Sequence, residues 1–301
     1  MKELMRVILS IGARGWLPIS DERYLKLRYK YILGYKLSLN PPRTFNEKLQ
    51  WLKLHDRKAI YTTMEDKYAA KEFVASRIGE KHIIPTYGVW NRFDEINFDE
   101  LPNQFVLKCT HDSGGLVICT SKEQFDMRAA QAKLEKALRH RYYYQGREWP
   151  YKDVPPRILA EQYVQDNTEK GNDAHQGLTD YKFYCFKGIP RYLYVSRGLD
   201  DHPTAHISFL NLDWSFAPFG RSDFKPFDEL PAKPKSLDEM IEIAKKLSAG
   251  TPFLRVDLYE VDGRVFFSEL TFSPCGGMMP FDPQEYDLVL GNMLELPKIN
   301  M

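Results

Sequence analysis

The sequence lacks the features that would place it in several specialised classes of protein. None of its apolar runs approaches the ~18 residues that a membrane-spanning helix needs. It has no excess of either charge, because 42 Lys and Arg residues against 41 Asp and Glu residues leave a formal net charge of +1, so we expect no nucleic-acid partner. Hydrophobic residues make up 43% of the chain, which excludes a disordered protein. At roughly 100–200 residues per domain, 301 residues allow two or three structural units.

Cysteine is also scarce. The four cysteines have no C-x-x-C spacing, which is typical of reduced thiols rather than of a disulfide framework or a zinc site, and this favours the cytoplasm. The first 18 residues do not read as a secretory signal, because Glu3 and Arg6 interrupt a short apolar stretch and no small-residue cleavage site follows. Leu4, Ile8 and Ile11 fit one helical face. We expect a helix packed on the body of the protein, and a membrane-surface helix is the alternative.

The apolar pattern predicts a helical beginning followed by mixed helices and strands. Residues 1–85 read mostly as helices, one of which begins after Thr44 with Glu47 three residues later, the spacing of a capping box. Residues 86–164 and 165–301 contain short β-branched strands as well as helices. Because the strands form hairpins rather than a strand–helix–strand series, the sequence predicts an α+β fold.

A β-hairpin near the C-terminus gives the strongest local signal. The runs FLRVDLYEV and RVFFSELTF flank the turn Asp262-Gly263, so Asp257 and Glu269 come on facing strands and can share one face. Two facing carboxylates repel, and a cation between them is the natural solution. Oxygen ligands without Cys or His favour Mg²⁺ or Mn²⁺. Arg255 points to the same face, so the alternative is an Arg255–Glu269 salt bridge on a solvent-exposed surface.

A second candidate site follows the strand FVLKC. Lys108 lies near the end of this strand, and the turn HDSGG comes next. Backbone N–H groups of Ser113, Gly114 and Gly115 can cradle phosphate oxygens while Lys108 supplies a point charge. The Walker A spacing is absent, and an ordinary hairpin turn is the alternative. Further along, the strand ILAEQYV carries Glu161, and backbone groups of a strand that crosses between two lobes can bind adenine.

In their order along the chain, these features resemble the ATP-grasp superfamily. The closer resemblance is to its TupA-like branch, and it is carried by PRTFNEKLQWLKLHDR, DKYAAKEFV, IIPTYGVW, VLKCTHDSGG and ELTFSP, over roughly residues 20–295. It implies an ATP-grasp fold with a mainly helical region at residues 1–85. The N-terminal lobe, with Lys108 and the glycine loop, would be residues 86–164, and the C-terminal lobe, with the metal hairpin, would be residues 165–301.

The resemblance also implies roles for single residues. Those implied in ATP binding are Lys108 and Lys182 at the phosphates, the mobile loop His111, Asp112, Ser113, Gly114 and Gly115, the adenine hinge Glu161, Tyr163 and Val164, and Asp166 at the ribose. Those implied as Mg²⁺ ligands are Asp257, Glu269 and Thr271, where Thr271 replaces the asparagine usual in the superfamily. Arg255, Lys182 and the Gly276-Gly277 turn would steady the reacting acyl phosphate. A hydroxyl is a weaker metal ligand than an amide oxygen, so the replacement puts a second metal ion in doubt.

The activity that the resemblance implies is an ATP-dependent carboxylate–amine ligase. TupA-like proteins are associated with cell-surface polysaccharide synthesis, so the implied acid is a hexuronic acid on a sugar nucleotide or glycan, and the implied amine is an amino acid. The N-terminal region would help to form the substrate side. The residues implied there are Asn46, Lys48, Asp66, Lys67 and Lys71. Solvated helix charges are the alternative interpretation of these residues.

Two other functions compete with the ligase. A sugar-nucleotide glycosyltransferase also uses paired acids and Mn²⁺, but commonly in a D-x-D motif, and this chain has only the adjacent pair Asp200-Asp201. A non-catalytic glycan-binding protein would use an aromatic platform such as Tyr142–Tyr144 with Trp149. ATP turnover separates the ligase from both alternatives.

Overall fold

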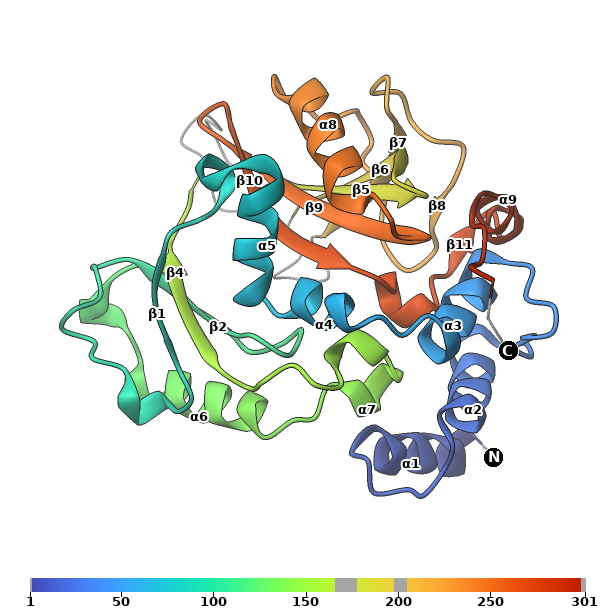
Figure 1. Cartoon of the computed structure of the whole chain (residues 1–301), viewed down its shortest axis with the longest axis horizontal. Helices are drawn as coiled ribbons and strands as arrows, with labels where there is room; N and C mark the ends of the chain where they lie inside the picture. Colours follow the sequence, from blue (N-terminus) through green and yellow to red (C-terminus); the bar gives the residue numbers. More distant parts are fainter. Residues whose placement is uncertain (1, 166–177, 198–204, 299–301) are drawn as a thin grey trace. The chain divides into compact units, whose positions relative to one another are not determined.

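The computed structural model of the chain describes residues 2–165, 178–197 and 205–298 (Figure 1). The chain folds into two compact units, each interleaved in sequence. Unit 1 consists of Met1–Leu27, Arg57–Phe73 and Ile83–Val164, and unit 2 of Arg28–Asp56, Val74–His82 and Gln165–Met301. Helices and antiparallel sheets occur together, so the α+β class predicted from the sequence is confirmed. The helical N-terminal residues are shared between the two units. The last segment of unit 1 ends at Val164, and the last segment of unit 2 begins at Gln165.

Helices and strands follow one another along the described residues. The α-helices are α1 (Lys2–Ala13), α2 (Asp21–Leu33), α3 (Phe45–His55), α4 (Ala59–Glu65), α5 (Ala69–Ile78), α6 (Met127–Leu138), α7 (Tyr143–Gly146), α8 (Leu237–Ser248) and α9 (Tyr286–Met293). The strands are β1 (Thr86–Trp90), β2 (Phe105–Cys109), β3 (Leu116–Cys119), β4 (Ile158–Gln162), β5 (Asp180–Phe186), β6 (Ile189–Arg197), β7 (His206–Asn211), β8 (Gly220–Arg221), β9 (Phe253–Val261), β10 (Arg264–Thr271) and β11 (Phe281–Asp282). Short 3₁₀ turns include η6 (Pro274–Gly277).

Unit 1 is built around a four-stranded antiparallel sheet in the order β1-β4-β2-β3 (Figure 1). Helix α6 packs on β2 and β3, and its buried residues Ala130 and Leu134 are four residues apart, which places them on one helical face. Phe105 and Leu107 of β2 join this core. Because side chains alternate along a strand, Lys108 points to the opposite face of the sheet.

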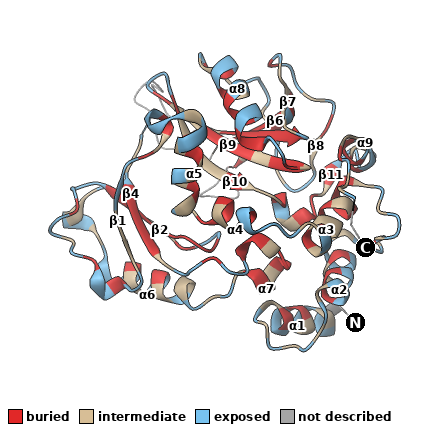
Figure 2. Ribbon diagram, viewed as in Figure 1, coloured by how far each residue is buried: buried red, intermediate tan, exposed pale blue. Residues whose placement is uncertain are grey.

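Unit 2 contains a five-stranded antiparallel sheet in the order β10-β9-β5-β6-β7, whose strands are largely buried in Figure 2. Helix α8 contacts β9, β5 and β6. Its buried residues are Leu237, Met240, Ile243, Ala244, Leu247 and Ser248. An aromatic cluster packs at the other face, where the Phe45 ring of α3 lies 4.9 Å from Phe253 and the Tyr184 ring 5.6 Å from Phe253. Since residues two apart on a strand share a face, the polar residues Arg255 and Asp257 lie on this aromatic side.

Helix α3 begins at the capping box that the sequence predicts. The Thr44 hydroxyl accepts a hydrogen bond from the Glu47 N–H at 3.2 Å, and the Glu47 carboxylate accepts from the Thr44 N–H at 3.1 Å. Such a cap contributes about 1 kcal/mol to helix stability. The cap fixes the position of α3, and its buried side, which includes Asn46 and Lys53, lies within unit 2.

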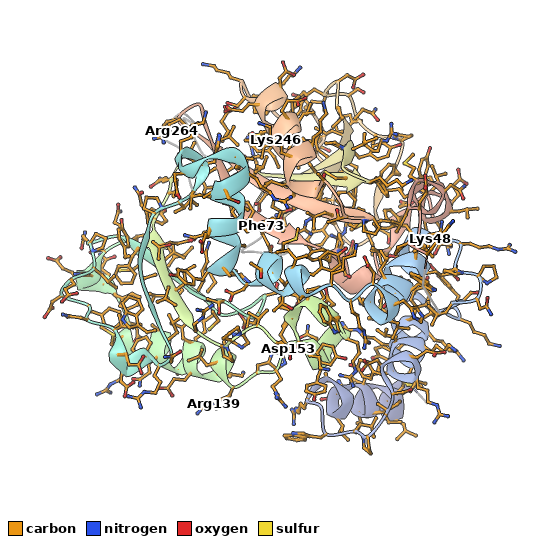
Figure 3. All side chains as sticks on the ribbon, viewed as in Figure 1. Lys48, Phe73, Arg139, Asp153, Lys246 and Arg264 are labelled. Carbon is orange, nitrogen blue, oxygen red and sulfur yellow. The ribbon has the colours of Figure 1, made fainter. Side chains whose placement is uncertain are left out.

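The hairpin of β9 and β10 also forms as predicted. Asp262 and Gly263 both have positive φ, and Val261 pairs with Arg264, so the loop has two residues (Arg264 is labelled in Figure 3). Beyond the loop a bulge between Phe267 and Glu269 shifts the register. The shift pairs Glu269 with Asp257 of β9, and both residues belong to the candidate site described below.

Helix α1 packs against α7, but through a different face from the one predicted. Leu9 and Gly12 are buried, whereas Leu4 and Ile11 are exposed. Helix α2 also approaches α1 closely at Gly12, because a Cβ there would lie 2.4 Å from the Tyr24 ring of α2. The apolar residues of α1 cover more of its circumference than the contact does, so the sequence alone did not identify the buried side. None of the helices among the described residues combines the length and apolarity required to span a bilayer.

Candidate active site

The polar face of the unit 1 sheet carries a carboxylate between two lysines. Glu161 of β4 is buried and pairs with Lys108 of β2, and Lys71 of α5 lies 2.9 Å from its other oxygen. Burial opposes ionisation of Glu161, but the charges of Lys108 and Lys71 outweigh it and hold its pKa below the ordinary value. Two cations around one anion leave a surplus of one positive charge on this face.

Lys71 is fixed in place by more than this ion pair. Its ammonium group also donates to the Ile84 carbonyl at 2.8 Å and to the Thr86 hydroxyl at 3.0 Å. Burial lowers its pKa, the carboxylate of Glu161 opposes that change, and the charge of Lys108 adds to it. The sequence interpretation put Lys71 on the substrate side, whereas the structure places it beside Lys108. The sequence signal was the motif DKYAAKEFV, in which Lys67 lies in the turn before α5 and Lys71 lies in the first turn of α5.

The glycine loop after β2 is held by its own residues. The buried Asp112 carboxylate accepts the Gly115 N–H at 3.1 Å from each oxygen, and Lys67 donates to the Asp112 carbonyl. The Gly115 N–H, expected to be a phosphate donor, is therefore already used. A Cβ at Gly115 would lie 2.7 Å from Cys109, so this glycine serves close packing. Ser113 and Gly114 form the exposed tip of the loop.

His111 anchors the same loop instead of extending from it. Its ring is buried, and Nε2 lies 3.1 Å from the His140 carbonyl just beyond α6. Burial lowers the pKa of His111, so the ring is neutral and Nε2 donates this bond. After β4, Tyr163 and Val164 are half-buried at the end of unit 1, and Asp166 lies outside the described residues.

In unit 2, strand pairing brings cations and carboxylates into one row. Asp257 of β9 pairs with Lys182 of β5 on one side and with Glu269 of β10 on the other. The Lys182 ammonium lies 3.0 Å from Asp257 and 3.1 Å from Asp180. Asp180 is a further member of this row that the sequence analysis does not include, although its D-x-K spacing to Lys182 on the same strand places both side chains on one face. Burial raises the pKa of Asp180, although Lys182 opposes the rise.

Arg255 donates two hydrogen bonds to the Asp257 carboxylate. Its Nε lies 2.7 Å and its Nη2 2.6 Å from the two carboxylate oxygens, and Nη2 also donates to the Thr271 hydroxyl at 2.9 Å. Asp257 is fully buried; burial opposes its ionisation, but Arg255 and Lys182 outweigh it and lower the pKa of Asp257. The expected alternative, an Arg255–Glu269 salt bridge, is present only as a looser contact at 3.7 Å.

The carboxylates of this row suit a divalent cation that also binds phosphate. Mg²⁺ is usually held by one or two protein carboxylates together with substrate phosphates, and Asp257 and Glu269 are direct cross-strand neighbours. Within the described ranges no group of three or more His, Cys, Asp or Glu side chains is arranged to hold a metal by itself. Asp257 and Glu269 are oxygen donors of the type that Mg²⁺ binds, but Arg255 already holds both Asp257 oxygens and Lys182 holds one of them, so these contacts must loosen before Asp257 binds a metal. Thr271 is placed to support Arg255.

The turn η6 after β10 is held in a left-handed conformation by α3. Cys275, Gly276 and Gly277 have φ values of 53°, 62° and 66°. Lys53 donates to the Gly276 carbonyl at 2.6 Å, and Gln50 donates to the Gly277 carbonyl at 2.6 Å. In a trans peptide the N–H points opposite to the C=O, so the Gly277 N–H is directed away from α3.

The helix residues that were expected on the substrate side all have protein partners. Asn46 exchanges two hydrogen bonds of 2.9 Å with the Met279 backbone. Lys48, labelled in Figure 3, donates to the carbonyls of Gly291 and Leu294 at 2.8 Å each. The Asp66 carboxylate lies 2.5 Å from Arg157. Asn46 and Lys48 thus bind the backbone of unit 2, Asp66 binds Arg157 just before β4, and Lys67 supports the glycine loop of unit 1.

Comparison with known proteins places these features in a family. The sequence matches the family model described as TupA-like ATPgrasp over residues 47–295. A search of curated proteins finds no match. Solved structures with a similar fold include D-alanine–D-alanine ligase from Helicobacter pylori (16% identity, 85% of this chain and 71% of that chain, TM-score 0.44) and the same enzyme from Bacillus anthracis, complexed with ATP (14% identity, 84% and 67%, TM-score 0.41). A RimK domain ATP-grasp protein from Sphaerobacter thermophilus is 12% identical over 80% of this chain and 70% of that chain, with a TM-score of 0.42.

These structural likenesses are loose, and the family match carries the assignment. It covers most of the chain and includes β2, β4 and the β9–β10 hairpin. It favours a ligase over the glycosyltransferase and the glycan-binding alternatives.

Proposed function

Because this chain belongs to the TupA-like ATP-grasp family and is an ATP-dependent ligase of that superfamily, we propose that it joins a hexuronic acid to an amino acid. The carboxylate would be carried on a sugar nucleotide or a glycan, and the product amide would enter cell-surface or capsular polysaccharide. The observation that best supports a ligase is the buried row of Lys182, Asp257 and Arg255, in which the two cations bind a carboxylate that pairs across the strands with Glu269.

The unit 1 cluster is proposed to bind the nucleotide. Lys108 and Lys71 carry one positive charge more than Glu161 neutralises, which favours a polyphosphate. The exposed tip at Ser113 and Gly114 can contribute backbone N–H groups to phosphate oxygens. Backbone groups at Tyr163 and Val164 would hold adenine, and Asp166 would hold the ribose.

The unit 2 row is proposed to hold the reacting phosphate. Asp257 and Glu269 would hold Mg²⁺, or Mn²⁺ in its place, which offsets the negative charge of the phosphate oxygens when bound. Arg255 and Lys182 would offset the charge that develops on the transferred phosphoryl group. Thr271 keeps Arg255 oriented, because its hydroxyl accepts from the same nitrogen that reaches Asp257.

The reaction has two steps. A carboxylate oxygen of the uronic acid attacks the γ-phosphorus of ATP, the bond to the bridging oxygen breaks, and ADP leaves. The amine then attacks the acyl carbon, loses a proton, and expels inorganic phosphate to leave an amide. The Gly277 N–H and the Arg255 guanidinium would stabilise the oxyanion of the tetrahedral species. The protein supplies position and charge, and needs no nucleophile of its own.

A substrate panel tests this proposal. Purified protein with ATP and Mg²⁺ is assayed for ADP release over uronic acids, free and nucleotide-linked, each paired with single amino acids. We expect ADP release only when acid and amine are both present, and we expect Asp257→Asn with Glu269→Gln to abolish it. Circular dichroism is the control for folding of the variant, and ATP binding by calorimetry is measured on the wild type. If the wild type binds ATP yet releases no ADP with any pair, the proposed substrates are wrong.

A further inference from the structure

The outer face of α1 stays apolar after the helix has packed on its own unit. At about 100° per residue, its apolar side chains cover an arc of roughly 200°, from Val7 through Leu4 to Leu9. Only the part of this arc around Leu9 and Gly12 is buried. The remaining part carries three aliphatic side chains to the surface, and Figure 2 shows buried and exposed colours along the same helix.

The exposed residues form a ridge. Leu4 is 65% exposed, Val7 47% and Ile11 38%, and their spacing of three and four residues keeps them on one side of the helix. Trp16 follows just after the helix and is 70% exposed. We name Leu4, Val7, Ile11 and Trp16 the α1 ridge. An exposed tryptophan beside an aliphatic row is the arrangement that the boundary between headgroups and acyl chains favours.

The charged residues of α1 and the segment after it are mostly positive. Residues 1–18 contain three basic residues and one acidic residue, a net charge of 3 − 1 = +2, while the whole chain carries only +1. The single acid, Glu3, is paired with Arg6. The Arg14 guanidinium lies 5.1 Å from the centre of the Trp16 ring. Residues 1–18 therefore carry more positive charge than the chain as a whole, and Arg14 lies beside Trp16 at the C-terminal end of the ridge.

We propose that the α1 ridge docks unit 1 on the surface of an anionic lipid bilayer. A bilayer satisfies both parts of the surface, since acyl chains accept the aliphatic side chains and anionic headgroups accept Arg6 and Arg14. A second copy of the chain suits it less well. A stable dimer needs about 800 Å² from each partner, with some 20–30 residues a side, and two facing copies would bring equal positive charges together. The ridge supplies far fewer residues than that.

Vesicle co-sedimentation tests the proposal. The full chain is mixed with vesicles of phosphatidylcholine alone or with 30% phosphatidylglycerol, at low and at high salt. We expect binding to the anionic vesicles, weakened by salt, and about tenfold or more weaker for Leu4→Ser/Val7→Ser/Ile11→Ser. The matched control, Ile118→Ser/Ile189→Ser/Leu288→Ser, removes three comparably exposed aliphatic side chains elsewhere, at 45–47% exposure, and should bind as the wild type. Arg6→Gln/Arg14→Gln should lose binding to anionic vesicles while keeping its circular dichroism spectrum.

Two results would overturn the proposal. One is absence of binding to anionic vesicles by a wild type that still binds ATP, and the other is equal binding by the ridge variant and its control. Sedimentation velocity gives a third decisive outcome, because a concentration-dependent dimer that the ridge substitutions abolish would make a second copy the occupant. Each variant is first shown to retain ATP binding, so a failed fold is recognised. This test is independent of which acid and amine the ligase joins.

Discussion

At the residue scale, Glu161 shows how unit 1 keeps two lysines close together. Lys71 and Lys108 approach the two oxygens of one buried carboxylate, so each cation depends on the same anion. Removing one partner of a buried ion pair leaves an uncompensated charge, which costs more than the pair itself contributes. The carboxylate is thus a structural requirement of the cluster as well as a candidate nucleotide contact.

Glu161→Gln should therefore destabilise the protein strongly. We expect the free energy of unfolding to fall by about 3 kcal/mol, because the two ammonium groups then face each other without their counter-ion. Urea denaturation followed by circular dichroism measures this change. Glu239→Gln is the control, since Glu239 is exposed and makes only long contacts, with Lys81 at 3.5 Å and with the His82 ring at 3.7 Å, which are worth less than about 1 kcal/mol. A loss as small as that of the control would contradict the account of the cluster.

The same ion pairs set the response to acid. The pKa values of Glu161 and Asp257 are held below their ordinary values of 4.5 and 3.8, so the folded state binds fewer protons at these sites than the unfolded chain. Their contribution to stability is present above those ordinary values and is lost as pH falls through the lowered ones. The gap in unfolding free energy between wild type and Glu161→Gln should therefore be full at pH 7 and shrink below about pH 4.5. A gap that does not change with pH would argue against the ion pairs.

Arg255→Lys tests the two-point grip on Asp257. Lysine keeps the charge but cannot hold both carboxylate oxygens and the Thr271 hydroxyl at once. We expect kcat to fall by about 10²–10³-fold, the usual cost of losing one oriented charge stabiliser. Thr271→Val removes only the supporting hydroxyl and should lower kcat by about tenfold. Steady-state kinetics measures kcat for each variant, and an unchanged ATP affinity shows that the fall in kcat does not come from weaker ATP binding. Equal falls in kcat for Arg255→Lys and Thr271→Val would contradict the assignment.

At the element scale, the sequence predicts caps and turns that depend on neighbouring residues, but it does not predict which distant strands pair. The capping box at Thr44 and the two-residue turn at Asp262-Gly263 depend on neighbours in sequence, so the residues themselves specify them. Lys182 and Asp257 are 75 residues apart, and their contact depends on β5 lying next to β9. No sequence pattern in the chain encodes that strand order. Asp180, by contrast, lies two residues before Lys182 on the same strand, so the D-x-K spacing in the sequence does indicate their contact.

The sequence likewise does not predict the hydrogen bonds between α3 and η6, which we call the interlock of these two elements. Gln50 and Lys53 are spaced as neighbours on one helical face, which reads as an ordinary polar surface. The structure shows Lys53 buried, with its ammonium group on the Gly276 carbonyl. A buried lysine among carbonyls fixes the orientation of a left-handed turn, which is why the turn can present its amide groups on the other side.

Gly277→Ala should disturb this interlock beyond the strain of its backbone. A Cβ at Gly277 would lie 2.5 Å from the Gln50 amide nitrogen, and the residue has φ of 66°. Gly79→Ala is the matched control, because Gly79 also has a positive φ of 96° but has open space around its Cβ position. We expect Gly79→Ala to cost about 1–2 kcal/mol and Gly277→Ala clearly more, measured by thermal unfolding. Equal costs would show that the contact with Gln50 is unimportant.

At the scale of the whole molecule, two α+β units each present a cationic cluster on one face of an antiparallel sheet. In unit 1 the surplus charge lies beside a loop with an exposed tip, and in unit 2 the cations lie beside paired carboxylates. The fold class and the Asp257–Glu269 pair followed from hairpins in the sequence, Lys108 followed from its glycine turn, and the roles of Glu161 and Lys182 followed from the resemblance to a family. The division of the first 85 residues between both units could not be predicted, because helices of similar composition pack in either place.

The central claim is that this ligase activates a carboxylate as an acyl phosphate. The most direct test uses a uronic acid labelled with ¹⁸O in its carboxylate, with ATP, Mg²⁺ and an amino acid, and analyses the products by mass spectrometry. The account predicts ADP, an amide, and inorganic phosphate that carries one ¹⁸O atom from the carboxylate. Release of AMP and pyrophosphate, or unlabelled phosphate alongside the amide, would contradict it.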